Sequence, residues 1–168
     1  MRRPILPRSV ERPRARGKQR HQVMREVNKS VLVHYSAEQI YELVDAVERY
    51  PEFLPWCGAA RVSRRDEHTT RATIQISYRG IKQSFTTENR KEPGRAMVIK
   101  LVAGPFKALD GNWRFTPLGE AGCKIDFQLT YEFSSRILEN LVGPVFNHIA
   151  ATMVEAFVRR AAEVYGAR

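Results

Sequence analysis

The central part of the chain alternates apolar and polar side chains with the period of two that is typical of β-strands. The clearest example is CKIDFQLTYEF, residues 123–133, where six apolar side chains alternate with five polar ones. Similar runs occupy residues 70–78, 81–90, 95–104 and 106–118. Because each run has one apolar side and the connections are short, the pattern predicts an antiparallel sheet with one face in solvent.

A β-branched run over residues 27–33 predicts one further strand, and a helical pattern follows it over residues 36–50. Ser36 and Gln39 have the spacing of a capping box, which predicts that the helix begins at Ser36. Pro51 predicts its end, because a proline disfavours helical backbone in the residue before it.

The apolar spacing returns to three and four over residues 137–164, which predicts a long C-terminal helix capped by the serines at 134 and 135. The Gly143-Pro144 pair predicts a kink or an interruption in its first turns. One short and one long helix must then cover one face of five or six strands. A strongly curved sheet wrapped around the long helix satisfies this demand and leaves an apolar gap between the two. The fold class is therefore α+β.

The segment YPEFLPWC, residues 50–57, is unusually apolar for a connection between a helix and a strand. Its two prolines fix the backbone and hold the aromatic side chains in place. Two interpretations remain open from the residues alone: the segment closes one end of the core as a plug, or it forms the rim of a pocket.

Most of the net charge of +10 lies in one terminal segment. Residues 1–22 hold eight Arg or Lys and one Glu, a net charge of +7. We predict that residues 1–23 are a disordered basic extension with salt-sensitive affinity for RNA or anionic lipid, and that residues 24–166 form one domain. Met24 as the true start is the alternative.

Two isolated cysteines, Cys57 and Cys123, fit a reducing compartment and neither a disulfide framework nor a zinc site. The N-terminus lacks the apolar centre of a secretory signal, and no uninterrupted apolar run reaches the length of a membrane span. These features predict a cytoplasmic protein with no bound metal and no transmembrane segment.

Three motifs in order, YPEFLPWC, GPFKALDGNWRFTPL (104–118) and FNHIAATMVEAFVRRAAEVY (146–165), resemble the START-like coenzyme Q-binding and RatA family, and its bacterial RatA branch above all. The resemblance covers residues 24–166 and implies a helix-grip fold of the START/Bet v 1 type with an apolar cavity. Coenzyme Q-binding members hold an isoprenoid quinone such as ubiquinone and support respiration. RatA-like members are toxins that bind the large ribosomal subunit and block subunit association. The resemblance therefore also raises an antitoxin partner and peripheral contact with the inner membrane.

Apolar side chains can supply most of the affinity for an isoprenoid quinone, which then needs no further cofactor. With such a cavity, the YPEFLPWC loop is predicted to form the rim of the pocket, and Gly104 and Pro105 predict a turn that presents Phe106 as a lid. The candidate ligand-binding residues are the large apolar side chains of the loop, of the sheet and of the long helix: Phe53, Leu54, Trp56, Phe85, Leu101, Phe106, Trp113, Phe115, Phe127, Leu129, Phe146, Ile149 and Met153.

An enzyme related to polyketide cyclases and aromatases, using the same cavity, is the alternative that the resemblance raises. A catalyst needs titratable groups that converge in the pocket. Only His148 among the four histidines falls near predicted core positions, and it has no carboxylate partner in the pattern. The prediction is a binding protein without catalytic residues.

The strands and turns of the sheet also carry many basic residues, which predict a diffuse basic outer face. Arginine near an aromatic ring suits contact with RNA phosphates and bases. The set comprises Arg61, Arg90, Lys91 and Arg95, together with the candidate ribosome-binding residues Arg64, Arg65, Arg71, Arg79 and Lys82.

Overall fold

A computed structural model of the chain describes residues 24–168, so the predicted basic extension over residues 1–23 lies outside the described residues. The order of elements is the predicted one, with a 3-10 helix (η1) inserted after the first helix. The elements are β1 (Arg25–Val33), α1 (Ala37–Asp45), η1 (Val47–Glu52), β2 (Cys57–Arg65), β3 (Thr69–Tyr78), β4 (Ile81–Glu92), β5 (Ala96–Ala103), β6 (Phe106–Leu118), β7 (Gly122–Phe133) and α2 (Arg136–Tyr165).

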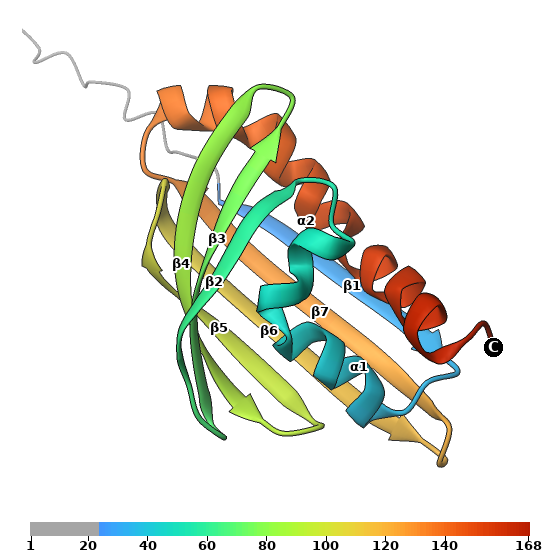
Figure 1. Cartoon of the computed structure of the whole chain (residues 1–168). Helices are drawn as coiled ribbons and strands as arrows, with labels where there is room; N and C mark the ends of the chain where they lie inside the picture. Colours follow the sequence, from blue (N-terminus) through green and yellow to red (C-terminus); the bar gives the residue numbers. More distant parts are fainter. Residues whose placement is uncertain (1–23) are drawn as a thin grey trace, which may run out of the picture.

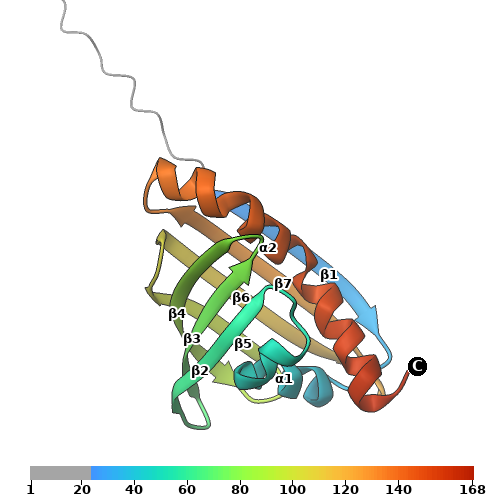
Figure 2. The same cartoon turned by 45° about the horizontal axis from the view of Figure 1, so that its top comes forward.

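The seven strands form one antiparallel sheet in the order β1-β7-β6-β5-β4-β3-β2 (Figure 1). Register shifts interrupt the pairing of β2 with β3, β4 with β5 and β6 with β7. Such bulges bend a strand and increase its twist. The sheet accordingly curves until β2, β3 and β4 stand over its other half (Figure 2).

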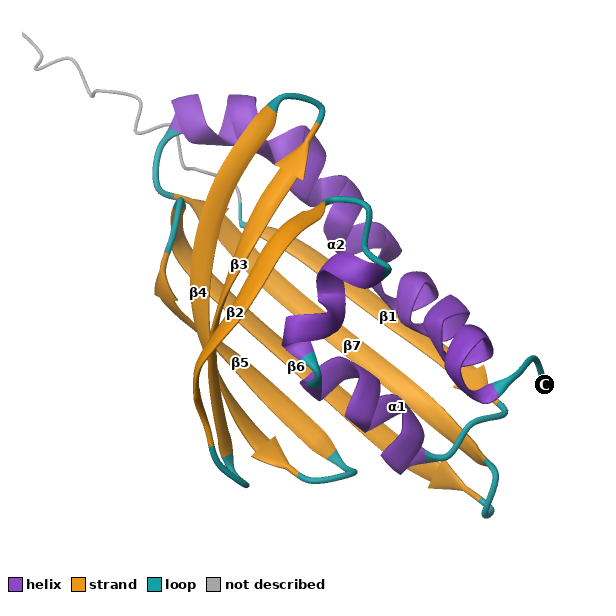
Figure 3. Ribbon diagram, viewed as in Figure 1, coloured by secondary structure: helices purple, strands orange, loops and turns teal. Residues whose placement is uncertain are grey.

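Helix α2 lies along the concave side of this sheet, and α1 with η1 covers the remaining end (Figure 3). The side chain of Ser135 caps α2 by accepting a hydrogen bond from the Leu138 amide at 3.2 Å. The helix is continuous through Pro144, although its first turns run at an angle to the rest (Figure 1). By length and composition α2 would be able to cross a membrane, but ten of its residues are buried and it serves as the core helix.

The predicted capping box at the start of α1 is confirmed, since Ser36 and Gln39 exchange backbone-to-side-chain hydrogen bonds of 2.9 and 3.1 Å. The predicted end of this helix at Pro51 was wrong. Helix α1 ends at Asp45, and the chain continues as the 3-10 helix η1, which contains Pro51. Tyr50 stabilises this tighter turn by donating a hydrogen bond from its hydroxyl to the Val44 carbonyl at 2.6 Å.

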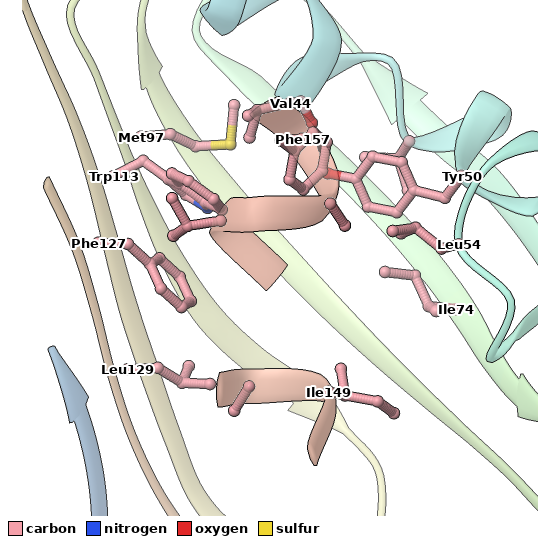
Figure 4. Packing of buried hydrophobic residues seen from close by; sticks show 14 of the residues in the cluster. Val44, Tyr50, Leu54, Ile74, Met97, Trp113, Phe127, Leu129, Ile149 and Phe157 are labelled. Atoms are coloured by element: carbon pink, nitrogen blue, oxygen red, sulfur yellow. Dashed lines mark hydrogen bonds between the residues drawn. The ribbon is translucent and has the colours of Figure 1, made fainter. Parts of the chain in front are cut away.

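The side chains between the concave face and the helices form one apolar cluster (Figure 4). Trp113, Phe127 and Leu129 enter it from the sheet on one side, while Tyr50 and Ile74 face them from the other. The predicted architecture, an α+β helix-grip fold, is confirmed.

Candidate ligand cavity

The apolar cluster encloses a cavity of about 60 Å³ between α2, η1 and the middle of the sheet. Twelve of its fourteen lining residues are apolar or aromatic, and the exceptions, Thr87 and Asn89, both come from β4. The lining comprises Val47, Tyr50, Ile74, Phe85, Thr87, Asn89, Ile99, Leu109, Trp113, Leu129, Phe146, Ile149, Ala150 and Met153.

Two groups of aromatic rings close the cavity at its two ends. At one end Phe146 packs against Phe106, with ring centroids 4.8 Å apart, and against Phe85 at 6.1 Å. At the other end Trp113 and Tyr50 both pack against Phe157, at 5.5 and 5.3 Å. The ring pairs Phe85–Phe146, Trp113–Phe157 and Tyr50–Phe157 meet edge to face, which is a favourable geometry for aromatic pairs and gives the cavity firm end walls.

Glycines allow close approach at the floor and at one end. A Cβ atom on Gly111 of β6 would lie 3.0 Å from Ile99 Cδ1 and 3.3 Å from Leu129 Cδ1, so these two side chains close over the strand. Gly104 has φ +148°, and a Cβ atom there would lie 2.6 Å from the Phe85 Cβ. A side chain at position 104 would therefore push the β5–β6 turn away from the cavity end.

Asn89 brings an incompletely paired amide to the lining of this apolar cavity. Its side chain is 6% exposed, and its Nδ2 donates only to the Met97 sulfur at 3.5 Å. Its Oδ1 is buried without a hydrogen-bond partner, and it is the only such side-chain atom in the part of the chain that the structure describes. Leaving a buried acceptor unpaired costs about 1–3 kcal/mol, which a ligand hydroxyl would recover.

The lining holds one titratable side chain, that of Tyr50. Burial raises the pKa of Tyr50, and its hydroxyl already donates to Val44, so it is a poor proton donor at neutral pH. The nearest buried ion pair joins Lys91 of β4 to Asp45 of α1 at 3.3 Å, and neither residue lines the cavity. This pair ties α1 to the sheet.

The structure places six of the thirteen predicted ligand-binding residues in the lining: Phe85, Trp113, Leu129, Phe146, Ile149 and Met153. The other seven pack elsewhere in or against the core: Phe53, Leu54, Trp56, Leu101, Phe106, Phe115 and Phe127. Thr87 and Asn89 were missed because the prediction considered apolar residues. Their position on the Phe85 side of an alternating strand was the signal that would have found them.

Most of the loop YPEFLPWC does not form the pocket rim that the sequence predicted. Leu54 and Trp56 are 1% and 5% exposed and do not line the cavity, so they act as a plug. Tyr50 alone in this segment lines the cavity, from η1. Phe106 likewise lies behind Phe85 and Phe146 and not at a rim, with ring centroids 5.9 and 4.8 Å from theirs.

The five candidate ribosome-binding residues lie at different places. Arg79 and Lys82 flank the β3–β4 turn, whereas Arg64 and Arg65 end β2 near the opposite end of β3, which is roughly 30 Å long. Arg65 and Arg71 bind Glu48 and Glu88, both at 2.8 Å, and Arg64 lies 3.3 Å from Asp66.

Lys91 belongs to the predicted basic outer set but does not lie on the outer face. It lies on the same concave side of β4 as Asn89, and its side chain is 3% exposed. Lys100 and Lys107 on the outer side are paired with Asp110 and Glu132. The outer face is therefore a mixture of both charges and not uniformly basic.

Comparison with known proteins identifies the family to which this helix-grip protein belongs. Residues 33–158 match the family model described as polyketide cyclase / dehydrase and lipid transport. Among solved structures, the Zhui aromatase/cyclase from Streptomyces superposes with a TM-score of 0.68 at 16% identity, over 83% of this chain and 94% of that one. At this identity the likeness shows the fold alone.

Two relatives narrow the assignment. The chain is 48% identical over 143 residues to the ribosome association toxin RatA of Vibrio cholerae, which covers 85% of this chain and 99% of that protein. It is 30% identical over 146 residues to the mitochondrial coenzyme Q-binding protein COQ10 homolog B of Xenopus laevis, covering 84% of this chain and 59% of that protein. The chain thus belongs to the polyketide cyclase / dehydrase and lipid transport family, in the group that contains the RatA and coenzyme Q-binding proteins.

Proposed function

We propose that this protein binds an isoprenoid quinone in the cavity and releases it chemically unchanged. The observation that carries the proposal is the unpaired Asn89 Oδ1 among apolar lining residues. Ligand sites are commonly apolar with a few polar groups that fix orientation. The Asn89 amide suits both redox states, because Nδ2 would donate to a quinone carbonyl and Oδ1 would accept from a quinol hydroxyl. The Xenopus relative named as a coenzyme Q-binding protein gives independent support.

The cavity must enlarge to take such a ligand. Its volume of about 60 Å³ is near that of two water molecules and well below the roughly 150 Å³ of a cavity that binds benzene. Met153 is the lining residue best suited to move, since it is half-buried and its side chain is unbranched. Each buried isoprene unit contributes about 4 kcal/mol, so two units offset much of the association cost.

The alternative of a cyclase-like enzyme has less support. Proton transfer to or from a substrate needs a titratable group within reach, and Tyr50 is the one such group in the lining. Its raised pKa and its hydrogen bond to Val44 leave it poorly suited to that role. The likeness to an aromatase/cyclase is limited to the fold. These observations favour binding without turnover.

The proposal is tested by purifying the full chain from a quinone-producing bacterium and extracting it for mass spectrometry. We expect close to one quinone per chain, and a large loss in the Asn89→Leu variant. The matched control is Asn28→Leu, because Asn28 lies on the exposed outer side of β1. An empty extract from folded wild-type protein that also fails to take up added ubiquinone would overturn the proposal.

Ribosome association is a second candidate function, favoured by the names of the RatA relatives. On the outer side of the sheet Arg61, Arg90 and Arg114 form no ion pair within residues 24–168, which leaves them free to contact phosphates. We expect the purified protein to reduce the joining of ribosomal subunits in sucrose gradients, and an Arg90→Glu/Arg114→Glu variant to do so less. Unchanged gradients would remove this candidate. The antitoxin partner and the cytoplasmic location stay predictions.

A further inference from the structure

The first turns of α2 expose an apolar edge that no described element covers. Ile137 and Leu141 are 79% and 53% exposed, and their spacing of four places them on one side of the helix. Exposed Pro144 and His148 continue the same side. The edge leads into a shallow groove of about 340 Å³, where the Tyr78 ring stacks on His148 with centroids 6.3 Å apart. We call Ile137, Leu141, Pro144 and Tyr78 the α2 edge.

Basic side chains surround the α2 edge. Arg79 stacks on Tyr78 at 5.1 Å, and Arg79, Lys82 and Arg136 have no acidic partner within residues 24–168. The nearby acids each have a basic partner, because Glu139 lies 4.0 Å from Arg25 and Glu132 lies 3.7 Å from Lys107. The β3–β4 turn with Arg79 stands beside the first turns of α2 in both views (Figures 1 and 2).

The first described residues of the chain lie at this same end. Residues 1–22 carry a net charge of +7 in the sequence and join the described chain at Met24, next to the Arg25–Glu139 contact with α2. At the opposite end α1 and η1 carry Glu38, Glu42, Asp45, Glu48 and Glu52, of which the last three pair with Lys91, Arg65 and Arg160. In Figure 1 the two ends lie far apart, so the unpaired cations near the α2 edge are remote from these acids.

We propose that the α2 edge docks on the surface of an anionic lipid bilayer. Aliphatic side chains ringed by cations match the layered chemistry of such a surface, in which acyl chains lie beneath negative headgroups. RNA would explain the cations but not the exposure of Ile137. The chain's own N-terminal segment and a second copy of the edge are both basic, so like charges oppose their binding there.

Docking at the α2 edge would also orient the cavity. Phe146 follows the edge directly in α2, and with Phe85 and Phe106 it closes the cavity end on this side. The bilayer would then face the Phe85–Phe146 end of the cavity. The inference goes beyond the proposed function and does not depend on which molecule the cavity holds.

The test measures co-sedimentation of the full chain with two kinds of vesicle, pure phosphatidylcholine and phosphatidylcholine with roughly 30% phosphatidylglycerol. We expect binding to the anionic vesicles that weakens with salt, and a loss of at least about tenfold in affinity for Ile137→Glu/Leu141→Glu. The matched control is Leu32→Glu, which adds charge at a site that is 67% exposed on the outer side of β1 and should bind like wild type. Neutral Ile137→Ser separates lost apolar area from added charge and should also weaken binding.

Several outcomes would overturn the inference. One is wild-type protein that does not bind anionic vesicles. Another is α2-edge variants that bind these vesicles like wild type. A third is a Leu32→Glu variant that loses as much vesicle affinity as the α2-edge variants. A wild-type dimer that Ile137→Glu dissociates would assign the edge to a second copy, and a loss confined to RNA binding would assign it to nucleic acid. Normal quinone content with no vesicle binding would refute this inference alone.

Discussion

Asn89 combines a structural disadvantage with a chemical use. Its carboxamide lies among side chains that offer it one weak acceptor, the Met97 sulfur, and leave Oδ1 unpaired. Buried polar atoms are nearly always paired in native proteins, so each exception needs a reason. A ligand that restores the missing hydrogen bond supplies that reason here.

We therefore predict that Asn89→Leu leaves the free energy of unfolding unchanged or raises it by about 1 kcal/mol, because an unpaired amide is replaced by an apolar side chain of similar volume. Urea denaturation of ligand-free protein measures this change. A decrease of more than about 1 kcal/mol would show that Asn89 has a structural role. The exposed Asn28→Leu control should change the free energy by less than about 0.5 kcal/mol.

The two cysteines should be unreactive in the folded protein. Burial raises the pKa of the Cys57 thiol to about 11, and burial does the same for Cys123. At pH 8 about one thiol in a thousand is then ionised in the folded state, against roughly a quarter in an unfolded chain. Iodoacetamide labelling followed by mass spectrometry should be slow without urea and fast with it. Rapid labelling of the native protein would contradict the burial of these residues.

The same shift gives the direction of a pH effect. Above about pH 8.5 the unfolded chain loses thiol protons that the folded chain retains. The raised thiol pKa values therefore contribute to the free energy of unfolding in full below pH 8.5. This contribution decreases as the pH rises toward 11.

At the scale of elements, α1 is fastened to the sheet through a buried charge. The Lys91 side chain is 3% exposed and lies 3.3 Å from Asp45, which also accepts a hydrogen bond from Thr70 at 3.2 Å. Arg65 adds a 2.7 Å bond to the Asp45 carbonyl. The C-terminal end of α1 is thereby held over β3 and β4, next to the cavity.

We predict that Lys91→Met lowers the free energy of unfolding by about 3 kcal/mol, because it leaves the Asp45 carboxylate without its buried partner. Thermal and urea unfolding measure this loss. Lys100→Met is the matched control, since its pair with Asp110 is exposed and should contribute less than about 1 kcal/mol. Equal losses in the two variants would show that burial does not distinguish the pairs.

The alternation of side chains predicted the strands and their inward sides, because one face of the sheet is buried throughout. It did not predict where α1 ends, since a 3-10 turn accommodates Pro51 where an α-helix would not. Nor could it separate the liners from the packed residues. Phe127 and Leu129 share a side of β7, but Leu129 lines the cavity whereas the Phe127 ring packs against Trp113 with centroids 4.4 Å apart.

The charge of the outer face depends on ion pairs between elements, which the alternation of side chains along the sequence does not predict. Arg71 meets Glu88 because β3 and β4 pair in that register, and Arg65 meets Glu48 because η1 folds back over β2. Lys91 was grouped with the basic residues of the outer face, although the alternation of β4 places it on the inward side, where a lysine is rarely found. These residues explain why the predicted basic face became a mixed one.

At the scale of the whole molecule, the helix-grip arrangement places one interior site between two chemically different ends. The Phe85–Phe146 end of the cavity lies near the basic α2 edge, and the Tyr50 end lies next to η1, where Glu48 and Glu52 are paired with arginines. We predict that the quinone lies between these ends, where Asn89 and Trp113 line the same cavity.

Trp113 makes this location measurable, because it lines the cavity whereas Trp56 packs outside it. The Trp56→Phe variant leaves Trp113 as the sole tryptophan of the chain, and short-chain ubiquinone quenches tryptophan fluorescence on contact. We predict saturable quenching of Trp113, weaker quenching of Trp56 in a Trp113→Phe variant, and loss of affinity on adding Asn89→Leu. Quenching that does not saturate, or that is the same for both tryptophans, would contradict a quinone site in the cavity.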